Sequence, residues 1–265
     1  MTPEGRPAAT GPSMAEFRRV AQPPEVRGRR GAEHWTADLY LRRISPYLSR
    51  ALVRTSVSAD AVTAAMIVAG IGAGAALLLP GLTGAVLAVL ATQVQMLLDC
   101  VDGEVARWRR RTSARGVFLD RIGHYSSELA IAGALGVRAG QGTGDVVMLA
   151  LGAALGALIM VNRAVNDMVH ASRAVAGLPP LSTDGGASAP RGRGLGRVWR
   201  AARLVPVHRS FHSVELTLLV AVAALVDLVR TETTQALLIV LVPVAALTVV
   251  GHVVAVLASD RLRRS

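Results

Sequence analysis

Long apolar runs alternate with short polar segments along most of the chain. No charged residue occurs from Ala61 to Leu98, and Pro80-Gly81 divides this stretch into two runs, each close to the ~20 residues with which a helix crosses a bilayer. Four further apolar runs follow, over about residues 116–137, 145–165, 213–228 and 235–258. The pattern predicts an all-α integral membrane protein with six transmembrane helices.

The segments before the first span are polar or amphipathic. Residues 1–33 are rich in Pro, Gly and Arg and have little to bury, which predicts a disordered cytoplasmic tail. In residues 34–56, Trp35, Leu39 and Ile44 fall near one helical face, which predicts short amphipathic helices on the membrane surface, with Ser45-Pro46 as the N-cap and first residue of the second. The predicted organisation is a tail (1–33), juxtamembrane amphipathic helices (34–56), a six-helix membrane domain (57–259, with a cytoplasmic loop at 171–211) and a basic tail (260–265).

Small residues dominate the apolar part of the composition. Hydrophobic residues make up 52% of the chain, aromatic residues only 3%, and 26 residues are Gly. This bias suits helices that pack closely in lipid. Gly152 and Gly156 form a small-xxx-small pattern in the fourth predicted span, which is compatible equally with close packing inside the monomer and with a homodimer face.

The charge is strongly basic and unevenly placed. All 29 basic residues are Arg, and the formal net charge is +11. Nearly all of them lie in the segments on the same side as the two termini, whereas the opposite side holds only Arg138 and Arg230. The positive-inside rule therefore predicts a multi-pass protein of the cell membrane with both termini in the cytoplasm. No nucleic-acid-binding signature accompanies the charge, so a nucleic acid partner is not expected.

Three aspartates and a histidine stand at helical spacing where the second and third spans meet. Asp99 and Asp102 are three residues apart, and Asp120 and His124 are four apart, so each pair shares one helical face. A short Arg-rich segment joins the two helices, which predicts antiparallel neighbours whose faces converge at the cytoplasmic membrane boundary. Carboxylates gathered near lipid repel one another, and one or two divalent cations would remove that cost. Oxygen ligands with open positions suit Mg²⁺ or Mn²⁺ holding a diphosphate.

Small and basic residues accompany these acids. Gly103 follows the second aspartate and Gly116 opens the third span, and glycine allows a bulky ligand to approach the backbone closely. Ala106 is also small, and Arg107 is a forked cation near the expected position of phosphate oxygens.

Read in order, these residues give D-x2-D-G-x2-A-R-x8-G-x3-D-x3-H. This resembles the signature of the CDP-alcohol phosphatidyltransferase family, D-x2-D-G-x2-A-R-x8-G-x3-D-x3-D, with every spacing equal and seven of the eight residue types identical. The resemblance implies transfer of a phosphatidyl group from a CDP-linked lipid, usually CDP-diacylglycerol, to a small acceptor alcohol, with release of CMP. Such an enzyme of phospholipid synthesis works at the cytoplasmic face among membrane lipids.

The resemblance also implies roles for single residues. Asp99, Asp102 and Asp120 would be ligands of Mg²⁺ or Mn²⁺. The CDP-binding residues would be Asp102, Gly103, Ala106, Arg107 and Gly116. The family's fourth aspartate helps to hold the metal and takes the acceptor's proton, and His124 stands in its place.

That replacement leaves alternatives open. A neutral imidazole can accept a proton, so His124 is the expected catalytic base and a further metal ligand. A catalytically impaired membrane protein that binds CDP-lipid and metal is the main alternative, and an enzyme that uses a CDP-linked polar headgroup as donor is another. A transporter is disfavoured because broken helices at mid-membrane are not seen in the sequence.

The acceptor alcohol is not identified by the sequence. Asn162 and Arg163 lie near the cytoplasmic end of the fourth predicted span, and Arg209 lies before the fifth, so these three are candidate acceptor-binding residues. For Arg163, extension of the side chain to the lipid headgroups is an equal alternative. Glycerol 3-phosphate, inositol phosphate, inositol and serine all remain candidate acceptors.

Overall fold

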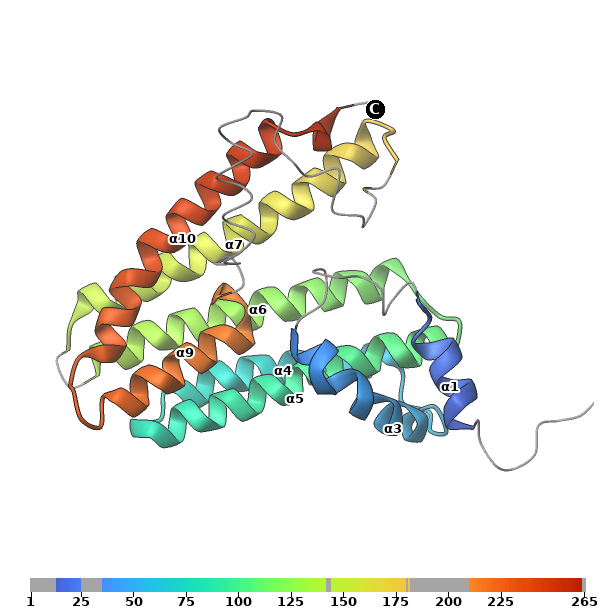
Figure 1. The fold of residues 1–265 in the computed structure, drawn as a ribbon, viewed down its shortest axis with the longest axis horizontal. Helices are drawn as coiled ribbons and strands as arrows, with labels where there is room; N and C mark the ends of the chain where they lie inside the picture. The colour runs from blue at the N-terminus through green and yellow to red at the C-terminus, as the bar shows by residue number, and fades with distance from the viewer. Residues whose placement is uncertain (1–12, 25–34, 142–143, 180, 182–209, 264–265) are drawn as a thin grey trace, which may run out of the picture. The chain divides into compact units, whose positions relative to one another are not determined.

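A computed structural model describes residues 13–24, 35–141, 144–179, 181 and 210–263, and every regular element in these ranges is helical (Figure 1). The chain divides into two compact units. Unit 1 is drawn from residues 1–68 and 94–123, and unit 2 from residues 69–93 and 124–265. Three helices, α4, α5 and α6, contribute residues to both units.

Within the part of the chain that the structure describes, four helices are long and apolar enough to cross a membrane. They are α4 (Ala59–Leu77), α5 (Gly81–Trp108), α7 (Val146–Val175) and α10 (Thr233–Leu257). The break predicted at Pro80-Gly81 is confirmed, because α4 ends at Leu77 and Gly81 starts α5 with a φ of 65°, a conformation that glycine adopts without strain. The all-helical fold and four of the predicted spans therefore agree with the structure.

The other two predicted spans do form helices, but neither has both the length and the composition of a span. Helix α6 (Ala114–Gly140) is long, yet it carries charged residues along its length, among them Arg121, Glu128 and Arg138. Helix α9 (Ser213–Val226) is apolar but has 14 residues. At about 1.5 Å per residue it is about 21 Å long, less than the ~30 Å of a hydrocarbon core. The six-span arrangement therefore stays a prediction.

The N-terminal region departs from the expectation of a disordered tail over residues 1–33. Residues Met14–Ala21 form helix α1, which begins where the Ser13 side chain accepts a hydrogen bond from the Glu16 N–H. Phe17 and Ala21 are fully buried, and the centroids of the Phe17 and Trp108 rings lie 5.2 Å apart. Tertiary packing of one small apolar face thus forms a helix in a segment whose composition is that of a tail.

Helix α3 (Arg42–Leu52) follows the π-helical turn η1 (Ala37–Leu41) without a break, so the N-cap predicted at Ser45-Pro46 is wrong. Pro46 lies inside α3 and has no N–H to donate to the carbonyl oxygen of Arg42, four residues earlier. The Gln22 side chain donates to that oxygen instead, at 2.9 Å, and so satisfies the acceptor. Ser45 is fully buried and faces another partner, described below.

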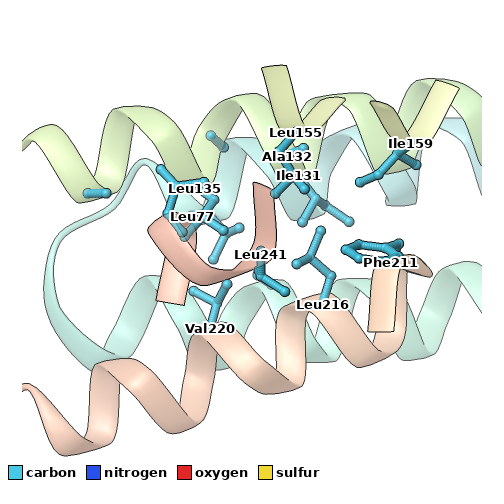
Figure 2. Close-up of a cluster of buried hydrophobic side chains, with 14 of the residues drawn as sticks. Leu77, Ile131, Ala132, Leu135, Leu155, Ile159, Phe211, Leu216, Val220 and Leu241 are labelled. Carbon is cyan, nitrogen blue, oxygen red and sulfur yellow. The ribbon is translucent and has the colours of Figure 1, made fainter. Parts of the chain in front are cut away.

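The main apolar core belongs to unit 2 (Figure 2). Leucine, isoleucine and valine side chains from α6, α7, α9 and α10 meet there, together with Leu77 of α4 and Phe211 before α9. Helices α7 and α10 run side by side (Figure 1). Within this unit α6 and α7 cross at Gly136 and Gly152: a Cβ built on Gly152 would lie 2.5 Å from the Gly136 Cα. Gly152 therefore serves packing inside the monomer.

Two polar groups close helix ends in the same unit. The Arg138 guanidinium donates to the carbonyl oxygens of Leu79 at 3.0 Å and Gly81 at 2.6 Å. The Asp227 carboxylate accepts from the N–H of Thr233 at 2.6 Å and of Thr234 at 3.2 Å, the first residues of α10. The Asp227 contacts supply acceptors to N–H groups that the start of a helix leaves without one, and the Arg138 contacts hold the turn between α4 and α5.

Candidate active site

A pocket of about 380 Å³ lies in unit 1, between the start of α4, the end of α5 and the start of α6. All the residues predicted to bind the CDP group line it: Asp102, Gly103, Ala106, Arg107 and Gly116. Asp99 and Asp120 line it as well, as do Asp60 and Thr63 of α4. The spacing of the motif along the sequence therefore corresponds to one wall of a single cavity.

The connection between α5 and α6 explains why the motif residues meet. Helix α5 ends at Trp108 and α6 begins at Ala114, so only five residues join them. Arg109 donates to the carbonyl oxygens of Leu52 and Thr55, at 3.1 and 2.8 Å, and thereby fastens this connection to the one between α3 and α4. The Arg-rich segment thus has a structural role besides the topological role that its charge predicts.

Two acidic side chains that line the pocket lie close together. A carboxylate oxygen of Asp99 lies within 4.8 Å of a carboxylate oxygen of Asp120. The Asp120 oxygen also lies within 4.8 Å of a ring nitrogen of His124, one turn further along α6. Two carboxylates so close repel each other unless a cation or a proton is shared between them. This donor set, two carboxylates beside an imidazole, fits a divalent ion such as Mn²⁺ or Mg²⁺.

Asp102 has a different environment from the other two aspartates. It is 9% exposed, and its Oδ2 accepts a hydrogen bond from Thr63 Oγ1 at 2.6 Å. The carbonyl oxygen of Ala59 lies 3.1 Å from the same Oγ1, so the single hydroxyl proton is shared between the two acceptors. The hydroxyl fixes the orientation of the Asp102 carboxylate. Thr63 could not be predicted as a site residue because it lies in an apolar run, and no spacing in the sequence relates it to the motif.

Gly103 and Arg107 fit together on the wall of the pocket. A Cβ built on Gly103 would lie 2.9 Å from Nη1 and 3.2 Å from Nη2 of Arg107, so the glycine leaves room for the guanidinium. At Gly116 a Cβ would meet only Ser113 Oγ at 3.5 Å and Asp60 Oδ1 at 3.8 Å, which is ordinary contact. The protein's own packing therefore requires glycine at position 103 more than at position 116.

A buried acid inside the motif was also missed by the sequence analysis. Glu104 is fully buried and accepts hydrogen bonds from Gln22 at 2.7 Å and from Ser45 and Ser49 at 2.6 Å each. Arg42 lies 3.8 Å away. The donors precede Glu104 by 55 to 82 residues, so no local pattern relates them to it. The only signal in the sequence is that a Glu occurs within α5, a helix that is apolar over most of its length.

The candidate acceptor residues lie in unit 2. Asn162 and Arg163 line a pocket of about 170 Å³ together with Glu128, Phe211 and both His212 and His252. Arg163 Nε donates to Glu128 Oε2 at 2.9 Å, and a second bond joins Nη2 to Oε1. Asn162 Oδ1 lies 2.9 Å from His252 Nδ1. Arg209 falls outside the described residues.

Comparison with known proteins agrees with the motif. Residues 56–180, which include α4, α5, α6 and α7, match the model of the CDP-alcohol phosphatidyltransferase family. This segment, which contributes the carboxylate-lined pocket, is therefore similar to the CDP-alcohol phosphatidyltransferase family, the same family whose signature the motif resembles. The family transfers a phospho-alcohol group from a CDP-linked donor to an alcohol. A search of curated proteins found no match to the chain.

Proposed function

We propose that the protein transfers a phosphatidyl or related phospho-alcohol group from a CDP-linked lipid, such as CDP-diacylglycerol, to a small alcohol. The acceptor oxygen forms a bond to the lipid-side phosphorus, the bond from that phosphorus to the CMP oxygen breaks, and CMP leaves. The observation that carries this proposal is the pocket of unit 1, where the acidic pair Asp99 and Asp120 shares a cavity with Asp102 and Arg107.

The acidic residues are the proposed metal ligands. Asp99, Asp102 and Asp120, with His124, would hold Mg²⁺ or Mn²⁺, which when bound neutralises diphosphate charge. The Arg107 guanidinium can donate two parallel hydrogen bonds to phosphate oxygens. Gly103 leaves space for the Arg107 guanidinium, and the small residues Ala106 and Gly116 leave room for the cytidine beside it.

His124 is the proposed catalytic base. It follows Asp120 by one turn of α6, so both side chains belong to one helical face. Imidazole can accept the proton of the acceptor hydroxyl as the new bond to phosphorus forms. A carboxylate at this position would do the same and would also bind Mg²⁺ better, so the replacement favours Mn²⁺.

The pocket around Asn162 and Arg163 is the proposed acceptor site, to which Arg209 would contribute. The pocket holds amide, imidazole and guanidinium groups that suit hydroxyl or phosphate oxygens. Alanine at Asn162 should therefore raise the acceptor KM more than the CDP-lipid KM.

The proposed location is the cell membrane, with the active site and both termini at the cytoplasmic face. The asymmetric distribution of Arg supports this topology. A cysteine at Gly140 should then react with an impermeant reagent in intact cells, and one at Ser188 should not, after replacement of Cys100. Reaction at position 188 would contradict the topology.

The function is tested directly by incubating the purified protein with CDP-diacylglycerol, Mn²⁺ or Mg²⁺, and a panel of alcohols, with CMP release as the readout. CMP release that depends on both metal and alcohol is the expected result. Binding of CDP-lipid without release of CMP would favour the catalytically impaired alternative. Turnover with a CDP-linked polar headgroup alone would identify a different donor.

A further inference from the structure

Helix α1 ends against the arginine of the motif. Arg107 Nε donates to the carbonyl oxygen of Ala21 at 2.6 Å, and Ala21 has no exposed surface. Arg107 also lines the pocket of unit 1. One hydrogen bond therefore connects a helix that precedes the family segment, residues 56–180, to a side chain of the proposed donor site.

This bond fixes the orientation of the guanidinium. The group is planar and has one Nε–H, so donation from Nε sets the direction of the plane. The two terminal nitrogens, Nη1 and Nη2, lie over Gly103, which also lines the pocket. The carbonyl of Ala21 thus aligns the part of the fork that suits a phosphate group with the wall of the cavity.

The end of α1 is itself held at several points. Gln22, the residue after Ala21, donates to Glu104 at 2.7 Å and to the carbonyl oxygen of Arg42 at 2.9 Å. Phe17 is fully buried and its ring packs against Trp108, next to Arg107 in α5. Because Glu104 is buried and accepts from Gln22, displacement of this turn would leave a buried carboxylate short of a donor.

We propose that helix α1, together with Gln22, positions a side chain that binds the CDP-linked donor. The helix holds the Arg107 guanidinium so that its terminal nitrogens meet the donor's diphosphate. The inference rests on the proposed function. Phe17 and Gln22 act through Arg107 and are positioning residues, whereas Arg107 itself touches the donor. The alternative is that α1 only stabilises unit 1. In that case the α1 variants that stay folded should keep the wild-type donor KM.

The test uses the full-length protein in lipid nanodiscs with CDP-diacylglycerol as the varied substrate. Phe17→Ala and Gln22→Ala should each raise the donor KM about five- to tenfold, as expected for a misaligned charge-assisted hydrogen bond. The acceptor KM should stay unchanged and kcat should stay within about twofold, because binding rather than the reacting groups is affected. Arg19→Ala, at an exposed position of the same helix, is the matched control and should behave as the wild type.

A double-mutant cycle separates positioning from stabilisation. Arg107→Ala should raise the donor KM, and Phe17→Ala should add nothing in that background, because the positioned group is gone. Arg107→Lys keeps the charge without the fork, and Gln22→Ala should add nothing there either, which gives a second cycle should Phe17→Ala fail to fold. If the two substitutions of either cycle raised the donor KM by the product of their separate effects, the inference would be overturned while the proposed function would stand. A wild-type donor KM in Gln22→Ala would have the same meaning. Absence of CDP-diacylglycerol binding by the wild type would overturn the proposed function as well.

Discussion

Arg163 and Glu128 form a two-point ion pair between α7 and α6 in unit 2. The Glu128 side chain is 1% exposed and that of Arg163 is 29% exposed. The two residues are 35 positions apart in the sequence, and the pair joins a charge of α6 to a charge of α7. Removal of Arg163 therefore leaves the buried Glu128 carboxylate without this cation.

Arg163→Ala and Glu128→Ala should each lower the free energy of unfolding by about 3 kcal/mol, since breaking a buried pair costs about that much. The double change Arg163→Leu with Glu128→Leu should recover most of the loss because neither charge remains. Thermal unfolding in detergent measures all three. If Arg163→Ala unfolds at the wild-type temperature, the pair contributes little to the fold.

Asp99→Asn and Asp120→Asn should each abolish metal-dependent binding of CDP-lipid and reduce CMP release by about 100-fold or more. Each change removes a charged ligand from a pair whose mutual repulsion a cation relieves. Titration of Mn²⁺ against the purified variants measures the loss. Asp145→Asn, which alters only the N-cap of α7, is the control and should keep its metal response. Equal Mn²⁺ affinity in the wild type and both variants would remove these residues from the metal site.

His124→Ala should lower kcat by about 100-fold while CDP-lipid binding persists, because general base catalysis contributes about that much or more. His124→Asp should keep part of the activity and shift the preference from Mn²⁺ toward Mg²⁺, because oxygen suits Mg²⁺ better than imidazole does. Initial rates at saturating substrate with each metal test both statements. A wild-type rate in His124→Ala would make the histidine structural and leave proton removal to another group.

Gly152→Ala should destabilise the protein by about 2 kcal/mol, as overpacking of a close contact does. The added Cβ would lie 2.5 Å from the Cα of Gly136 and 3.0 Å from the carbonyl oxygen of Ala132, and backbone cannot turn away as a side chain can. Gly72→Ala is the matched control, because a Cβ there meets no atom within 4 Å. Melting temperatures of the two variants should differ by several degrees, and equal values would mean that α6 and α7 separate without cost.

Asp227 should make stability depend on pH in the acidic range. Burial raises its pKa, but hydrogen bonds from Thr234 and Thr233 outweigh that effect and hold the pKa below its ordinary value of about 3.9. Its contribution is therefore complete above about pH 3.9 and is lost as the pH falls through the lower pKa of the folded protein. Asp227→Asn should be less stable than the wild type at neutral pH by about 1 kcal/mol, as expected for a lost helix cap. Unfolding at decreasing pH should show that difference disappear, and a constant difference would contradict the assignment.

The helical spacing of the motif accounts for how several of its residues come to line one pocket. The separation of Asp99 from Asp102 corresponds to one helical turn, and a short connection brings Asp120 of the next helix to the same pocket, so this part of its wall follows from the sequence. Thr63, Glu104 and Glu128 could not be predicted in the same way. Their partners come from other helices, and pairings of this kind leave no period in the sequence.

The same reason explains why the structure does not confirm every part of the predicted fold. Hydropathy identifies helices that are apolar along their whole length, such as α10, but α6 combines an apolar run with charges that the interior of the protein accommodates. Composition made residues 1–33 look like a tail because it does not register that Phe17 has an aromatic partner in Trp108, 91 positions later.

Pro46 has a consequence for how changes in this sequence can combine. The carbonyl oxygen of Arg42, which Pro46 cannot engage, is the acceptor for Gln22. Any residue other than proline at position 46 would bring an N–H that competes for this oxygen, so the value of glutamine at position 22 depends on the residue at position 46. A carbonyl oxygen that lacks a helical donor in one segment thus becomes the acceptor that holds another segment. Substitutions at positions 22 and 46 should therefore depend on each other, although 23 residues separate them.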